Sequence, residues 1–248
     1  MNENNRRLHD LGQSLWVDNI TRGTLDDGTL KGYIEDLSVT GLTSNPTIFE
    51  KAIGGGNDYD AQIAELAASE SDPEQIFFEL AMADLRRAAD DFEEIHEKTD
   101  RVDGYVSLEV SPLLADDTEA TIAQAADLYK RIDRKNVFIK IPGTPAGLPA
   151  IEETIFAGIP VNVTLLFSTE QYLAAADAYL KGVERRIEAG LNPAINSVAS
   201  LFISRWDAAV IDDVSPELRA KLGIAVGKQA YAAYRELIAS DRVQILAN

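Results

Sequence analysis

Short apolar runs alternate with longer amphipathic stretches along this chain. The runs are rich in Val, Ile and Leu, which is typical of strands buried on both faces. They predict strands at residues 15–18, 38–43, 105–110, 137–141, 161–167 and 195–202. Helical spacing of apolar residues marks 58–96, 118–132 with Thr118 as its cap, 147–157, 168–189 and 216–239. Strands that alternate with helices pair in parallel through right-handed crossovers, so the pattern predicts a parallel α/β fold.

A lysine interrupts the fourth predicted strand. Lys140 follows Val137-Phe138-Ile139 and precedes Ile141 and a Pro142-Gly143 turn. Lysine is almost never fully buried unless it is paired, and desolvation disfavours its ammonium form. A neutral amine in an apolar site is the nucleophile of Schiff-base chemistry on carbonyl substrates. The alternative is an edge-strand lysine whose amine reaches water.

The other predicted strands also carry polar residues, and those of the first three lie at or near the C-terminal ends. These residues are Asp18, Asn45, Glu109, Asn162 with Thr164, and Ser200. Each has an alternative reading as a helix cap, a turn residue or a hydrogen-bonded core residue. In parallel α/β barrels, however, catalytic groups come from the C-terminal ends of several strands. A polar residue on every strand therefore predicts one site around Lys140.

Composition and charge limit the classes of function. The chain has 248 residues, of which 46% are hydrophobic, and a formal charge of −18. Such a charge argues against nucleic acids and anionic membranes as partners, and it requires local cations for any anionic substrate. Arg205 is a candidate cation, with an ion pair to Asp207 or another surface carboxylate as the alternative. Cysteine is absent, the N-terminus is polar and no long apolar stretch occurs, so we expect a cytoplasmic protein without disulfides or Cys-bound metals.

Four segments resemble the signatures of transaldolases. They are residues 41–49 (GLTSNPTIF), 137–142 (VFIKIP), 161–168 (VNVTLLFS) and 200–205 (SLFISR). The similarity runs in order from about residue 11 to residue 205. The Asn-Pro-Thr-Ile-Phe and Ile-Pro-Gly-Thr segments resemble those of the longer bacterial transaldolases.

The resemblance implies a fold and a reaction. The fold would be a parallel (β/α) barrel of the TIM type, forming one domain over residues 1–248 with the Schiff-base lysine on the fourth strand. The reaction would transfer a dihydroxyacetone unit from sedoheptulose 7-phosphate to glyceraldehyde 3-phosphate in the non-oxidative pentose phosphate pathway. The family needs neither a metal nor an organic cofactor, and its ligands are phosphorylated sugars. Neither the sequence nor the resemblance indicates an oligomeric state.

The resemblance also implies roles for single residues. Lys140 matches the residue that forms the Schiff base, and Asp18 the carboxylate that takes the proton of the hydroxyl lost on cleavage. Glu109 and Thr164 match the pair that positions a water for proton transfer. Contacts to substrate are implied for Asn45, Asn162, Ser200, Phe202 and Arg205, with Ser200 and Arg205 at the phosphate.

One feature departs from the family. A TIM barrel has eight strands, and only six can be recognised before residues 241–248. We therefore expect a C-terminally incomplete barrel with two unpaired edges, low stability and little activity. The alternatives are a non-catalytic truncated barrel fragment and an enzyme of the fructose-6-phosphate aldolase type. Glu109 and Phe202 argue against the latter, because that subfamily resembles Gln and Tyr at these positions.

Overall fold

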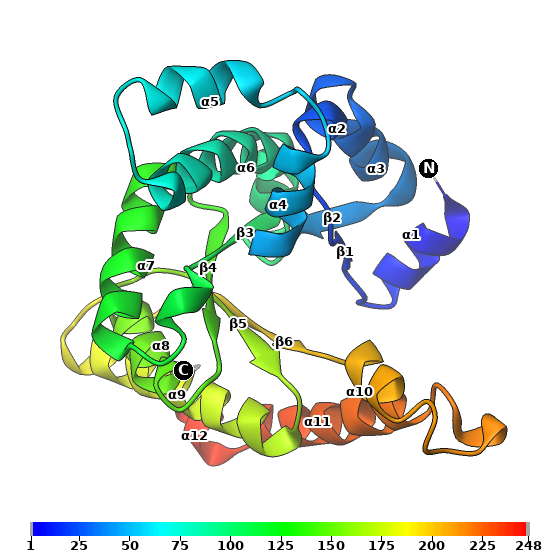
Figure 1. The fold of residues 1–248 in the computed structure, drawn as a ribbon. Coiled ribbons are helices and arrows are strands. Elements are labelled where there is room, and N and C mark those ends of the chain that lie inside the picture. Colours follow the sequence, from blue (N-terminus) through cyan, green and yellow to red (C-terminus); the bar gives the residue numbers. More distant parts are fainter. Residues whose placement is uncertain (1, 247–248) are drawn as a thin grey trace. The chain divides into compact units, whose positions relative to one another are not determined.

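Six strands follow one another in a single sheet within the residues that the computed structural model describes, 2–246 (Figure 1). The strands are β1 Leu15–Val17, β2 Val39–Leu42, β3 Tyr105–Glu109, β4 Val137–Pro142, β5 Val161–Leu166 and β6 Ser197–Leu201. Their order is β1-β2-β3-β4-β5-β6, and the pairs β1–β2, β2–β3 and β5–β6 are parallel. A strand order without reversal is that of TIM-type folds and differs from doubly wound sheets, so the predicted fold class is confirmed.

Helices connect the strands and extend beyond the last one. They are α1 Glu3–Asp10, α2 Arg22–Asp26, α3 Thr29–Leu37, α4 Pro46–Gly54, α5 Asp60–Ala67, α6 Pro73–Lys98, α7 Thr118–Ile132, α8 Gly147–Phe156, α9 Thr169–Glu188, α10 Ser204–Ala209, α11 Leu222–Ile238 and α12 Asp241–Leu246, with 3-10 turns η1 Pro112–Leu114 and η2 Pro216–Leu218. None of the helices in the described part of the chain has the length and apolar character that crossing a membrane requires.

The helix predictions were less accurate than the strand predictions. The helical region predicted at 58–96 consists of two helices, because α5 ends at Ala67 and Asp72 caps a new helix that has Pro73 at its first position. Thr118 is also not a cap: it is the first residue of α7, and the Asp117 carboxylate accepts the Ala120 N–H at 2.9 Å. The sequence pattern missed α1 to α4, and residues 216–239 divide into η2 and α11. Met1, Ala247 and Asn248, which the predicted domain includes, lie outside the described residues.

The chain divides into two compact units. Unit 1 extends to Ser111 and includes Asp127–Ile139; unit 2 contains Pro112–Ala126 and the chain from Lys140 onward. The expectation of a single domain stays a prediction.

The core of unit 1 contains a group of aromatic rings from β1, β3, β4 and α6. Phe138 of β4 stacks on Tyr105 of β3, with ring centroids 3.9 Å apart, and on Trp16 of β1, at 6.1 Å. The His96 ring meets Tyr105 edge-on at 4.7 Å. Gly41 of β2 is opposite Trp16 in the β1–β2 register, and a Cβ on Gly41 would overlap the indole. Glycine is therefore required at this point of β2, because the ring needs the space.

An ion-pair network joins α12 to α9 in unit 2. The Arg242 guanidinium donates to both Glu184 oxygens at 2.6 and 2.9 Å, and to Asp177 at 2.7 Å. Hydrogen bonds from Lys181 and then from Arg242 lower the pKa of Asp177, and the hydrogen bond from Arg242 lowers the pKa of Glu184. These carboxylates are stabilised in their charged form by the fold.

Replacing Arg242 should lower the free energy of unfolding in a pH-dependent way. A carboxylate whose pKa is lowered by folding stabilises the fold above its unfolded pKa, about 4, and loses this contribution as the pH falls through its folded pKa. Because the Arg242, Glu184 and Asp177 side chains are 36%, 33% and 43% exposed, Arg242→Met should cost less than about 1 kcal/mol at pH 7. Denaturant unfolding at pH 7 and pH 3 should show the difference shrink at low pH.

Lys31→Met is the matched control for this experiment, because the exposed Lys31 makes a single, longer ion pair with the half-buried Asp91 at 3.5 Å. It should change the free energy of unfolding by less than Arg242→Met does. A difference between wild type and Arg242→Met that is the same at both pH values would show that the ion pairs are not its source.

Candidate active site

Lys140 lies in a strand that is buried along its whole length. All residues of β4 are buried, and Lys140 is 6% exposed. β4 is an interior strand in the sheet order, so the alternative of an edge-strand lysine that reaches water is wrong. Lysine is among the residues least often buried, so this position calls for a specific partner or a chemical role.

The turn that follows Lys140 is tied to its surroundings by backbone and side-chain hydrogen bonds. The Gly143 N–H donates to the Thr164 carbonyl at 2.8 Å, which joins the end of β4 to β5. The Thr144 hydroxyl donates to the Ala115 carbonyl at 2.7 Å and accepts the Gly147 N–H at 2.9 Å. A Cβ on Gly147 would overlap the last carbonyl of β4, so glycine permits the close approach of α8 to this strand.

Two of the predicted site residues lie on the same face of β5. Asn162 and Thr164 are each 1% exposed and are separated by one residue of the strand. The Ser200 hydroxyl of β6 donates to Asn162 Oδ1 at 2.8 Å. This bond fixes the side-chain amide of Asn162, because its oxygen is occupied and its NH2 group must point away from Ser200.

The backbone of β5 changes direction directly after Thr164. Leu165 has φ of 59°, in the left-handed region that Leu rarely adopts. The β5–β6 register shifts between Val163 and Leu166 at the same point. A bulge of this kind bends its strand and re-aims the neighbouring side chains, and such bulges are common next to active sites. The bulge was not predicted from the sequence, since a Leu-Leu pair gives no signal for it.

The residues that follow β6 form an aromatic and cationic group. The Phe202 ring stacks on Phe167 with centroids 5.3 Å apart, and the Arg205 guanidinium lies 5.0 Å from the centre of the Phe202 ring. The Trp206 indole N–H donates to the Phe167 carbonyl at 2.8 Å, which ties α10 to the end of β5. Arg205 is exposed, and within residues 2–246 it makes no ion pair.

The predicted alternative for Arg205, an ion pair with Asp207, is not formed. Asp207 instead accepts the Gly223 N–H at 3.1 Å, and so binds the start of α11. A Cβ on Gly223 would overlap the Ile203 carbonyl, so glycine is needed for this contact between α11 and the start of α10. Arg205 therefore lies on a helix, α10, that is hydrogen-bonded both to the end of β5 and to α11.

Unit 1 places three predicted site residues at the ends of its strands. Asp18 directly follows β1 and is exposed, and Glu109 is the last residue of β3 and is half-buried. Asn45 caps α4: its side-chain oxygen accepts the Ile48 N–H at 3.0 Å. Asn45 is thus a helix cap rather than the turn residue of the alternative reading, and its NH2 group, which the cap does not use, is the part suited to a ligand.

Ser44 is a buried polar residue that the sequence analysis missed. It is 1% exposed, and its hydroxyl donates to the Ser107 carbonyl of β3 at 2.7 Å. A serine between a strand and a helix cap has no distinctive sequence signal, because its partner is set by the pairing of β2 with β3.

Comparison with known proteins identifies the class. A family model described as transaldolase/fructose-6-phosphate aldolase matches residues 15–248, and the chain therefore belongs to this family. Among its relatives, a transaldolase of Saccharopolyspora erythraea is 47% identical over 99% of this chain and 68% of its own length. A transaldolase of Mycobacterium tuberculosis is 46% identical over 99% and 68%, and transaldolase 2 of Nostoc sp. is 43% identical over 97% and 68%.

These relatives confirm the predicted resemblance to transaldolases. The alignments cover nearly all of this chain and about two thirds of each relative's own length, and the expectation of a C-terminally incomplete barrel stays a prediction.

Proposed function

We propose that this chain, a transaldolase by its family and relatives, transfers a dihydroxyacetone unit from sedoheptulose 7-phosphate to glyceraldehyde 3-phosphate through an imine on Lys140. The observation that carries the proposal is the burial of Lys140, 6% exposed, in an interior strand. A lysine amine removed from water is the group that Schiff-base chemistry uses on ketones. The products are erythrose 4-phosphate and fructose 6-phosphate.

The reaction divides into imine formation and carbon–carbon cleavage. Lys140 Nζ adds to the ketose C2 carbonyl, and loss of water from the carbinolamine gives a protonated imine. Asp18 takes the proton of the C4 hydroxyl, the C3–C4 bond breaks, and its electron pair passes into the imine to give an enamine. The enamine then adds to the aldehyde of the acceptor, and hydrolysis of the new imine frees the amine. Positioned acid–base groups typically contribute about 10²–10⁴-fold to each such step.

Glu109 and Thr164 have the chemistry to manage the water of this sequence. A carboxylate accepts a proton from water and a hydroxyl orients it, as carbinolamine dehydration requires. Asn162 and Asn45 carry side-chain amides, which are suited to hydrogen-bonding substrate hydroxyls, and their oxygens are positioned by the Ser200 hydroxyl and the Ile48 N–H. The substrate would thus meet donors on its hydroxyls and an acid–base pair near C2.

Arg205 is the proposed phosphate ligand. Its exposed guanidinium has five N–H donors suited to two phosphate oxygens at once. Ser200 is a less direct phosphate ligand, because its hydroxyl donates to Asn162 Oδ1. The hydroxyl must break this hydrogen bond and rotate before it can donate to a phosphate oxygen. The fructose-6-phosphate aldolase alternative gains no support from a specific observation, because Glu109 and Phe202 differ from the Gln and Tyr of that subfamily.

Borohydride reduction in the presence of fructose 6-phosphate should attach the substrate carbon skeleton to Lys140. Mass spectrometry of peptides from the purified chain should find the adduct on Lys140, and Lys140→Met should abolish it. Lys135→Met is the matched control, because Lys135 is exposed and should leave the adduct intact. An adduct on another lysine, or none on the wild-type chain, would contradict the assignment.

Glu109→Gln and Asp18→Asn should slow different steps. Glu109→Gln should slow the formation of the imine that borohydride traps. Asp18→Asn should still form this imine but release the aldehyde product slowly. We expect each rate to fall by about 10²–10⁴-fold. Single-turnover trapping and aldehyde release, measured side by side, separate the two steps. Wild-type rates in both variants would mean that these carboxylates are structural.

Arg205→Ala should weaken binding of phosphorylated sugars selectively. The loss of hydrogen bonds to a charged group should raise KM for fructose 6-phosphate about 10- to 100-fold, with little change for dihydroxyacetone. Arg219→Ala is the control, since Arg219 is an exposed arginine at the end of η2, and this variant should leave both KM values unchanged. Equal effects of Arg205→Ala on both substrates would refute the phosphate clamp.

A further inference from the structure

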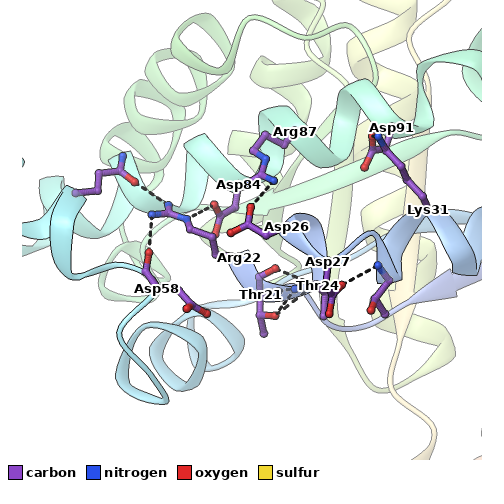
Figure 2. Close-up of polar contacts among 12 residues, drawn as sticks. Thr21, Arg22, Thr24, Asp26, Asp27, Lys31, Asp58, Asp84, Arg87 and Asp91 are labelled. Carbon is purple, nitrogen blue, oxygen red and sulfur yellow. Dashed lines mark hydrogen bonds and ion pairs between the residues drawn. The ribbon is translucent and has the colours of Figure 1, made fainter.

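A buried polar cluster in unit 1 joins three segments that are far apart in the sequence. Arg22 Nε donates to Asp84 Oδ1 at 3.0 Å, and the Tyr59 hydroxyl donates to Asp84 Oδ2 at 2.8 Å. The side chains of Arg22 and Asp84 are only 14% and 1% exposed. Figure 2 shows Arg22 between Asp84 of α6 and Asp58 of the loop after α4.

All four nitrogen atoms of Arg22, three in the guanidinium and one in the backbone, donate hydrogen bonds in this cluster. Its guanidinium also donates to the Asp58 carbonyl at 3.3 Å and to Gln62 Oε1 at 2.7 Å, and lies 4.3 Å from the centre of the Tyr59 ring. The Arg22 backbone N–H donates to the Tyr59 hydroxyl at 3.0 Å. The Arg22 main chain, Tyr59, Asp84 and the Arg22 side chain thus form a closed circuit of hydrogen bonds. This circuit fixes the backbone of Arg22 as well as its side chain.

Arg22 ends the short connection that carries Asp18. It is the first residue of α2, which Thr21 begins with a capping box that includes Thr24 (Figure 2). At the other end, β1 is held by its pairing with β2 and by the Thr43 N–H, which donates to the Val17 carbonyl at 2.9 Å. Ile20, between the two ends, is 1% exposed and fills the core. Asp18 is therefore an exposed carboxylate on a segment with little freedom to move.

The cluster is a costly way to stabilise a fold. Burial raises the pKa of the Asp84 carboxyl and of the Tyr59 hydroxyl, opposed at Asp84 by Tyr59 and Arg22. Apolar residues of similar volume often stabilise a core as well as a buried ion pair does, whereas the ion pair admits fewer geometries. What it supplies here is a defined position for the start of α2.

We propose that Arg22, Tyr59 and Asp84 are positioning residues that hold the connection from β1 to α2 so that Asp18 meets the C4 hydroxyl of the substrate. The inference rests on the proposed function of Asp18. The cluster should affect the rate of carbon–carbon cleavage and leave the rate of imine formation unchanged, because imine formation depends on Lys140, Glu109 and Thr164. A misplacement of about 1 Å far from the chemistry can cost on the order of 10²-fold in rate, so loosening the cluster should be visible in cleavage.

Tyr59→Phe is the sharpest test, since it removes one hydroxyl and keeps the ring under the guanidinium. We expect aldehyde release in a single turnover to fall about 10-fold or more, with KM for fructose 6-phosphate and the yield of borohydride-trapped Lys140 unchanged. Hydrogen exchange should become faster in residues 18–24 and stay the same in the rest of unit 1. Asp84→Asn should act in the same direction and more strongly, and Tyr33→Phe, on α3, should do neither.

Three outcomes would overturn the inference. One is wild-type cleavage and exchange in both Tyr59→Phe and Asp84→Asn. A second is an equal fall of cleavage and trapping, and a third is faster exchange spread evenly over unit 1, since both would indicate a general loss of stability. If the wild-type chain traps no substrate on Lys140, the proposed function fails, and exchange alone then decides whether the cluster holds residues 18–24.

Discussion

The burial of a lysine in the middle of β4 is the constraint on which the surrounding structure depends. An amine in a strand with no exposed residue needs polar surroundings, and a parallel strand buried on both faces otherwise contains only apolar residues. The neighbouring strand β5 accordingly carries Asn162 and Thr164, both 1% exposed, on one face. Polar groups in this setting must be hydrogen-bonded, and the bond from Ser200 to Asn162 meets that requirement on β6.

The sequential strand order explains why such polar residues accumulate where strands end. Parallel strands connected by right-handed crossovers have their carboxyl ends at one edge of the sheet, and the loops that follow are free to carry function without disturbing the core. Asp18, Asn45 and Glu109 end or follow strands of unit 1 in this way, as Phe202 and Arg205 follow β6 in unit 2. The apolar halves of the same strands do the packing, as the stack of Trp16, Tyr105 and Phe138 illustrates.

Periodicity and residue chemistry were enough to predict β3, β4, β5 and α7 almost to the residue. These elements have strong apolar patterns, and their burial follows directly from them. The break between α5 and α6 was missed although Asp72-Pro73 is a typical helix start, because the helical pattern continues on both sides of it. The positive φ of Leu165, the bond from Ser200 to Asn162 and the cluster at Asp84 depend on strand register and on contacts between distant segments. No local pattern encodes those contacts, whereas the identity of Lys140 and its apolar flanks does encode a buried amine.

Three functional segments in this chain are each anchored by a side chain that takes no part in the proposed chemistry. Thr144 binds the turn after β4 to Ala115, Trp206 binds α10 to Phe167, and Arg22 binds the start of α2 to Asp84. In every case a side chain reaches a group far away in the sequence, so the loop is held by the scaffold rather than by its own residues. Loops without such bonds open at low free energy, and a group that must be placed within a fraction of an ångström cannot be carried on them. In the proposed reaction, different steps use catalytic groups from different strands, so the steps depend on different anchors. Because each anchor holds one segment, loosening one of them should impair the step that its segment serves and leave the other steps intact.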